Sequence, residues 1–415
     1  MTFNKSVKTL LLTFVLIVNF SVFAFLNTAE GPGIAFAINL YKKSYVASSF
    51  LPVIRDLVSI IISFIIVGFL PKIGYKKLLI CCLLIISVSC FTLPGINNFR
   101  AMLLLFAIIG AVFAITKICI YTLISLIFND KKKHARILTL MEGYYNVFQV
   151  LSFLLFYFFI RINDKQAWKY IFSLYGAILI FVIVIWKFIP LQKSLWANPR
   201  QPRQGFNFSA LVEISKRPKT ATYLYMIALY VYVEVSLFAW LPTFNEKALN
   251  IDISHSILLA SILMISIALS RFIGTVILKY LSWNFLIFSL MTAALFYLSL
   301  VLIRQNIFGA NMIGRIPATA YLLPLVGLFL GPVYPVMASV TLKTVDNSEV
   351  PVLMILMQLC EGLGAIFGPI ITGYTFDYYG PIYAFFMLLI PLLGVWLCLL
   401  RINVRKITER EYQVI

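Results

Sequence analysis

The sequence predicts an all-α integral membrane protein with twelve transmembrane helices in two pseudo-symmetric six-helix bundles. Hydrophobic residues make up 62% of its 415 residues and charged residues 12%, which is a composition typical of membrane proteins. Apolar segments long enough to cross ~30 Å of hydrocarbon recur along the chain. A polar interval then divides these segments into two sets of six.

The predicted spans follow one another at short intervals. They are 9–36, 46–70, 78–94, 102–128, 135–160 and 168–189, then 221–244, 256–281, 283–303, 320–342, 352–374 and 382–400. The first segment also has features of a cleaved signal peptide, because Lys5 and Lys8 precede its apolar run. Its continuation past Gly33 favours a span. The predicted domains are an N-terminal bundle at 1–190, a cytoplasmic linker at 191–219 and a C-terminal bundle at 220–415.

The net charge of +19 is explained by membrane topology. With the N-terminus in the cytoplasm, most of the 34 Lys and Arg residues fall in segments on the cytoplasmic side, as the positive-inside rule requires. The densest cluster is Lys131, Lys132, Lys133 and Arg136. It is typical of a loop beside anionic lipid, and less so of a nucleic-acid site. We therefore expect a multi-pass protein of the cell (inner) membrane, with both termini cytoplasmic and no nucleic-acid partner.

The two halves carry a weak internal repeat. GFLPKIGYKKLL follows the second span and GTVILKYLSWNFL ends the eighth, and in both a glycine precedes a lysine, Lys72 or Lys279, by four or five residues. Repeated halves are typical of secondary transporters, in which the halves move about a site near the membrane midplane.

These features resemble the major facilitator superfamily, which also has a basic central loop and a lysine-rich turn like that at 68–77. YVYVEVSLFAWL (230–241), SRFIGTVILKYL (270–281) and GLFLGPVYPVMASVTLK (327–343) resemble the fucose and glucose/galactose permease branch. The resemblance implies the family's two-bundle fold and proton-coupled sugar import, with acidic residues in the first and fourth spans. In this chain the fourth span carries Lys117 instead of an acid, and Pro71 replaces the acid of the family's loop.

Ionisable side chains inside a span need a partner or a water-filled cavity, because each costs ~2.5–3.5 kcal/mol at the bilayer centre. We predict a gating network of Arg55, Asp56, Lys117, Glu142, Arg271 and Glu361. Arg55 and Asp56 are expected to bind other residues, since neighbouring helix positions point about 100° apart. Lys117 and Glu142 are expected to pair, either as a switch or as a packing contact.

The resemblance also implies that spans two and eleven, and spans five and eight, meet across the halves. We hypothesise that Arg55 or Asp56 meets groups near Glu361 in one state, and that Glu142 exchanges between Lys117 and Arg271.

Polar residues in the spans predict a solute cavity. Glu142, Asn146 and Gln149 share one stripe of the fifth span, which suits a hydroxylated or amide-bearing solute or, alternatively, helix packing. Tyr230 and Glu234 share a face of the seventh span. The predicted cavity residues are Asn19, Asn27, Glu30, Glu142, Tyr145, Asn146, Gln149, Tyr230, Glu234 and Tyr334. The candidates for proton coupling are Glu234, Glu142, Asp56 and Glu361, although Glu234 is alternatively a protonated packing residue.

Two glycine patterns predict a helix break and a close contact between helix backbones. Gly31, Pro32 and Gly33 predict a break in the first span, which is either a site or an ordinary helix end. Gly364 and Gly368 form a small-xxx-small pair, which is common where helix backbones approach.

An enzyme is disfavoured, because no catalytic, phosphate-binding or metal motif occurs and the two histidines, His134 and His255, lie at loop edges. We expect no cofactor and no metal. The preferred function is secondary active transport by alternating access in a monomer, importing a small polar solute with protons, with sugar as the first candidate. The alternatives are efflux of a drug or siderophore-like metabolite, and a polytopic membrane enzyme or scaffold.

Overall fold

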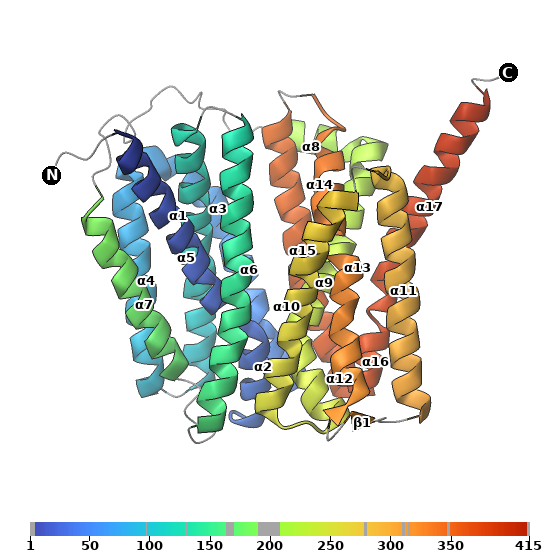
Figure 1. Cartoon of the computed structure of the whole chain (residues 1–415), viewed down its shortest axis with the longest axis horizontal. Coiled ribbons are helices and arrows are strands. Elements are labelled where there is room, and N and C mark those ends of the chain that lie inside the picture. The colour runs from blue at the N-terminus through green and yellow to red at the C-terminus, as the bar shows by residue number, and fades with distance from the viewer. Residues whose placement is uncertain are drawn as a thin grey trace. The chain divides into compact units, whose positions relative to one another are not determined.

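A computed structural model describes most of the chain. The described residues are 5–96, 98–128, 131–162, 170–189, 208–277, 280–308, 312–313, 316–346 and 349–412. Within them, twelve helical segments are long and apolar enough to cross a membrane (Figure 1), which confirms the predicted fold class. Residues 191–207 of the predicted linker, Lys279, and the side chains of Lys72, Lys131, Lys132, Lys133, His134 and Arg136 lie outside the described part.

The chain divides into two compact units. Unit 1 comprises Met1–Lys42 and Ile54–Gln204, and unit 2 comprises Lys43–Val53 and Gly205–Ile415.

Unit 1 is built mainly from the first six spans. Its helices are α1 (Lys5–Asn27), α2 (Glu30–Asn39), most of α3 (Tyr45–Ile73), α4 (Tyr75–Ile96), α5 (Phe99–Ile127), α6 (Lys131–Ile162) and α7 (Tyr170–Lys187). The α1 helix packs mainly against α6, and α4 packs against α5 and α7. Gly74 lies between α3 and α4 with φ of 86°, a left-handed conformation that glycine adopts without a steric penalty.

The first span is interrupted earlier than its Gly-Pro-Gly run predicts. The α1 helix ends at Asn27 and α2 begins at Glu30, so that Pro32 lies in the first turn of α2. Proline is tolerated there because the first amide groups of a helix have no partner within it. The interruption therefore falls at residues 28–29, between the predicted cavity residues Asn27 and Glu30.

Unit 2 contains the last six spans and two short additions. Its elements are α8 (Phe208–Lys216), α9 (Pro218–Leu249), α10 (Ile253–Ile277), α11 (Trp283–Phe308), β1 (Met312–Ile313), β2 (Ile316–Pro317), α12 (Ala318–Leu322), η3 (Leu323–Val326), α13 (Gly327–Leu330), α14 (Val333–Leu342), α15 (Val350–Tyr379), α16 (Pro381–Phe386) and α17 (Leu389–Tyr412). The two strands form an antiparallel hairpin in which Met312 pairs with Pro317.

The tenth span is a broken helix. Its pieces, α12, η3, α13 and α14, continue one another in orange in Figure 1. Pro324 and Pro332 have no amide hydrogen to donate, so some backbone carbonyls in the span need other donors. Tyr297 donates to the carbonyl of Leu322 (2.8 Å), and Tyr230 donates to that of Leu330 (2.9 Å). Side chains of neighbouring helices therefore support the broken span.

The α9 and α15 helices approach closely through glycines. A Cβ atom on Gly364 would lie 2.3 Å from the carbonyl oxygen of Ala228, and one on Gly368 would lie 2.6 Å from that of Tyr232. The predicted small-xxx-small pair therefore marks a close backbone contact within unit 2.

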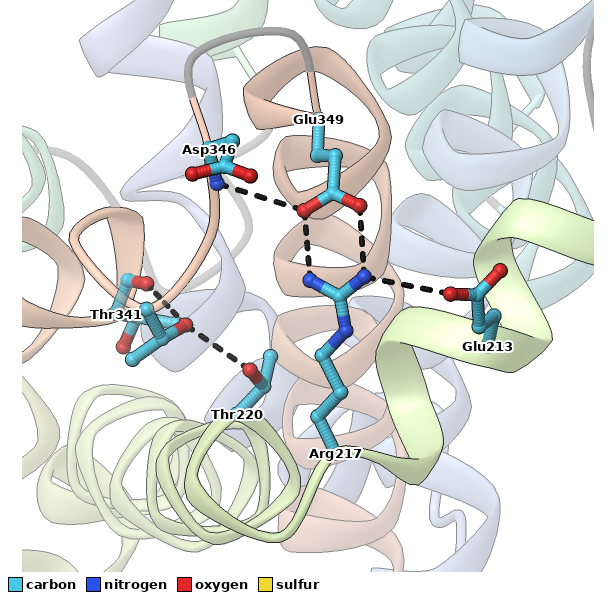
Figure 2. A network of polar contacts seen from close by, with 7 residues as sticks. Glu213, Arg217, Thr220, Thr341, Asp346 and Glu349 are labelled. Atoms are coloured by element: carbon cyan, nitrogen blue, oxygen red, sulfur yellow. Dashed lines mark hydrogen bonds and ion pairs between the residues drawn. The ribbon is translucent and has the colours of Figure 1, made fainter.

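An ion-pair network joins the start of α9 to α15 (Figure 2). Arg217 donates two hydrogen bonds to the carboxylate of Glu349, at 2.6 and 2.7 Å, and a longer one of 3.4 Å to Glu213 of α8. A hydrogen bond between Thr220 and Thr344 lies beside it at 3.0 Å. The hydrogen bonds from Arg217 lower the pKa of Glu349, which lies outside the spans.

We expect Gly364→Ala to lower the free energy of unfolding by about 1–3 kcal/mol, because the methyl group would overlap the Ala228 carbonyl. Thermal unfolding in detergent measures this effect. Gly143→Ala is the matched control, since a Cβ there would have nothing within 4 Å. Equal losses in both variants would contradict the close contact.

We expect Glu349→Gln to lower the thermal midpoint at pH 7, where the wild-type carboxylate is ionised and bound by Arg217. Because the folded-state pKa of Glu349 is lowered, its contribution is present above its ordinary pKa and is lost as the pH falls through the lowered value. The midpoints of wild type and variant should therefore begin to converge below the ordinary pKa of glutamate and meet below its lowered value. Glu213→Gln is the control, and a constant difference across this range would contradict the account.

Candidate functional site

Arg55 is the centre of a charge cluster inside unit 1. Its guanidinium lies 2.6 Å from Glu30 Oε2 and donates to both carboxylate oxygens of Asp56, at 2.8 and 3.0 Å. It also donates to the backbone carbonyl of Asn27 (3.1 Å), directly before the interruption of the first span. The three charged side chains are 10–19% exposed. The positive charge of Arg55 is therefore compensated by two acids, and its guanidinium also donates a hydrogen bond to a carbonyl at the helix break.

The prediction that Arg55 and Asp56 do not pair with each other is wrong. Their Cβ atoms point in different directions on the helix, but the long arginine side chain turns back and forms a bidentate contact. A planar guanidinium matches the geometry of a carboxylate, and charge-assisted bonds of this kind are strong. Helical direction alone is therefore a poor guide to contacts of long side chains.

Asn27 and Tyr145 extend the cluster towards α6. The amide of Asn27 donates to the Tyr145 hydroxyl at 2.9 Å. The ring of Tyr145 lies 5.1 Å from that of Phe20 and 6.2 Å from that of Phe113, measured between centroids. Aromatic rings of α1 and α5 thus pack against the ring of Tyr145, whose hydroxyl accepts a hydrogen bond from Asn27.

Glu142 is bound by a tyrosine that the sequence analysis missed. Tyr121 of α5 donates its hydroxyl to Glu142. No ion pair joins Lys117 to Glu142 in the described part of the chain, which corrects that expectation. The ammonium of Lys117 instead lies 6.0 Å from the centroid of the Tyr121 ring. The contact between Lys117 and Tyr121 could have been predicted from the sequence, because the two residues are one helical turn apart.

Three amides of unit 1 stay open to a further partner. Asn146 and Gln149 are half-buried, and no hydrogen bond to either is found among the described residues. Asn19 is fully buried, and both polar atoms of its amide are unpartnered within the described structure. Unsatisfied polar groups are costly in an apolar environment. These amides are therefore the groups of unit 1 best suited to bind water or a solute.

Unit 2 contains a second cluster, centred on Glu234. Arg271 Nη2 lies 3.7 Å from Glu234 Oε1, and Arg271 Nε donates to the Gly331 carbonyl at 3.4 Å. The Tyr230 hydroxyl lies 3.3 Å from Glu234 Oε1, so the predicted shared face of α9 brings the two together. As in unit 1, an arginine contacts both an acid of its own unit and a carbonyl in a broken span.

Tyr334 connects Glu361 to this second cluster. Its hydroxyl donates to Glu361, and its ring stacks on Tyr230 with centroids 6.3 Å apart and planes inclined by 28°. The predicted residues thus lie in two sets, one in each unit. The expected exchange of Glu142 between lysine and arginine stays a prediction, as does the expected contact of Glu361.

We expect Arg55→Gln to destabilise unit 1 by about 3–5 kcal/mol, because two largely buried carboxylates would lose their cation. The double variant Glu30→Gln/Arg55→Gln should recover part of this loss, since one stranded charge is removed. Thermal unfolding in detergent gives the order of the variants. A double variant less stable than Arg55→Gln would show that the Arg55 and Glu30 side chains act independently.

Comparison with known proteins identifies one matching family and several solved structures with a similar fold. The family model described as Major Facilitator Superfamily matches residues 9–322 and 305–412. A crystal structure of a single-residue mutant of the nucleoside transporter NupG is similar, with a TM-score of 0.76 at 12% identity, covering 95% of this chain and 99% of that one. Among curated protein sequences, none matches this chain.

Two further solved structures share the fold. The D-xylose-proton symporter gives a TM-score of 0.69 at 12% identity, with 93% of this chain and 97% of that chain covered. A bacterial homologue of the human lysosomal transporter Spinster, in an inward-facing and occupied conformation, gives 0.64 at 14% identity, with 95% of each chain covered.

Proposed function

Because the chain belongs to the major facilitator superfamily and is a transporter, not an enzyme, we propose that it imports a small polar solute together with protons by alternating access. A sugar or a sugar-containing solute is the first candidate. By the positive-inside rule, we infer that it works in the cell (inner) membrane with both termini in the cytoplasm. We expect a monomer, since each six-helix set occurs within one chain.

The observation that carries this proposal is that three polar side chains inside the spans, those of Lys117, Asn146 and Gln149, are not fully buried. They lie within the α5 and α6 spans, where Lys117 is exposed and the two amides are half-buried. A lysine facing lipid tails at this depth would be expensive, and open amides would be too. An aqueous path along α5 and α6 removes both costs, and such a path is what a transported solute needs.

The chemistry of the two clusters favours hydroxyl groups on the solute. Carboxylates accept hydrogen bonds from hydroxyl groups, and amides both donate and accept. Aromatic rings beside these groups, such as Phe113 and Tyr145, offer an apolar face to a ring. Two of the similar structures are named for a sugar and for a nucleoside, which contains a sugar. These points support a sugar-like solute for this chain.

Glu234 is the proposed proton site. It is the acid that Arg271 and Tyr230 both approach, and its side chain is 14% exposed. Protonation would remove the charge that attracts Arg271, which also donates to the Gly331 carbonyl of the broken tenth span. Proton binding would thus be linked to the conformation of that span. Glu142, Asp56 and Glu361 remain alternative proton sites.

We expect purified protein in proteoliposomes to accumulate D-xylose or uridine when the outside is made acidic. Glu234→Gln should reduce this gradient-driven accumulation at least tenfold while exchange at equal pH persists, because the substituted amide does not load and unload a proton. Radiolabelled uptake measures both activities. Glu213→Gln is the matched control, since Glu213 lies outside the spans and is 76% exposed.

Two outcomes would contradict the proposal. Gradient-driven accumulation that survives Glu234→Gln would remove Glu234 as the proton site. Solute movement only out of vesicles loaded with solute would favour efflux.

A further inference from the structure

The two units carry the same tyrosine–glutamate pair on corresponding spans. In unit 1, Tyr121 of the fourth span donates its hydroxyl to Glu142 of the fifth. In unit 2, Tyr334 of the tenth span donates its hydroxyl to Glu361 of the eleventh. The fourth and fifth spans correspond to the tenth and eleventh when the halves are taken as repeats. Each glutamate is therefore bound by a tyrosine from the span that precedes it.

The two glutamates lie towards the same end of their spans, although not at the same depth. Glu142 is two residues into the span Leu140–Arg161, and Glu361 is nine residues into the span Val352–Tyr379. Each is thus in the first half of its span in chain order. The pair therefore recurs on the same two spans of each half, which indicates a retained element of the repeat.

Neighbouring groups hold both tyrosine rings. Phe20 packs against Tyr121 with centroids 6.0 Å apart, and Lys117 lies over the same ring. Tyr230 stacks on Tyr334. A packed phenol has little freedom to turn, so its hydroxyl points in a fixed direction and restricts the carboxylate that it binds. These contacts suit the tyrosines to position the glutamates.

We propose that Tyr121 and Tyr334 are matched positioning residues that aim Glu142 and Glu361 as acceptors for solute hydroxyl groups. This inference rests on the proposed function and narrows its substrate class. A carboxylate aimed in this way accepts hydrogen bonds and donates none, so the substrate class is a solute that carries hydroxyl donors. An ionised carboxylate only accepts hydrogen bonds and has lone pairs for more than one donor, so a phenol and a solute hydroxyl can bind it together.

The first test compares tyrosine variants in D-xylose and uridine exchange, which needs no proton gradient. Tyr121→Phe and Tyr334→Phe should each raise KM about tenfold with little change in maximal rate, because an unaimed carboxylate binds the solute hydroxyl less well. KM changes with little change in maximal rate distinguish this role from general damage to the bundle.

Tyr175→Phe is the matched control. It removes one tyrosine hydroxyl from inside a span, where that hydroxyl forms a hydrogen bond with Ser152. Its KM should stay near the wild-type value. Equal KM changes in the control and in the two test variants would overturn the inference.

The second test needs no solute. Infrared difference spectra, assigned with Glu142→Gln and Glu361→Gln, report the carboxylate stretching band of each glutamate. Tyr121→Phe should shift the band of Glu142 and Tyr334→Phe that of Glu361, whereas Tyr175→Phe should shift neither band. Unchanged bands in the test variants would overturn the pairs, whatever the transport result.

The two tests separate the possible failures. If wild-type protein exchanges neither probe but the bands shift as expected, the proposed sugar-like solute is wrong and the tyrosine–glutamate pairs stand. If exchange is normal and KM is unchanged in both test variants, the role in solute binding is wrong and the proposed function stands.

Discussion

Ionised groups inside the spans set the main physical constraint on this protein. A lone charge in hydrocarbon is costly, and each unit lowers this cost by bringing an arginine to an acid from its own helices. Arg55 contacts Glu30 and Asp56 in unit 1, and Arg271 approaches Glu234 in unit 2. The packing of α2 and α3, and of α9 and α10, is therefore tied to charge compensation as well as to apolar contact.

The helix breaks are part of the same arrangement. An interrupted helix leaves backbone carbonyls without their usual donors, and such groups need partners inside a membrane. Arg55 supplies a donor to Asn27, and Arg271 supplies one to Gly331. Each arginine thus joins an acid to an irregular segment of backbone. A change in the charge or position of the acid would therefore move the arginine and weaken its hydrogen bond to the backbone at the break. Such a link suits a protein that must change conformation.

Much of the fold was predictable from the sequence, because span length and hydropathy are local properties. The Tyr230 and Glu234 contact was also predictable, since residues one turn apart share a helix face. The nine-residue helix α8 was missed, because a short segment within a polar linker gives no span signal. The break in the first span was predicted from Gly31 and its neighbours but lies slightly earlier.

The charge contacts were harder to predict. The Arg55–Asp56 pair depends on how a flexible side chain turns, which helix geometry does not fix. The bond from Tyr121 to Glu142 depends on the register of α5 against α6, and the sequence does not state this register. Residue type and depth therefore predicted which side chains need partners, whereas tertiary packing decided which partners they have.

The central claim is that an aqueous path runs along α5 and α6. Access of water to Asn146 and Gln149 of α6 tests this claim most directly. Single cysteines at Asn146 and Gln149, in a background without the six native cysteines, are exposed to a charged, membrane-impermeant thiol reagent applied from either face of sealed vesicles. The account predicts that both positions react, and that the more reactive face changes when solute or a proton gradient is added. Absence of reaction from both faces, with full reaction after denaturation, would show that these residues lie in dry contacts and would contradict transport along this path.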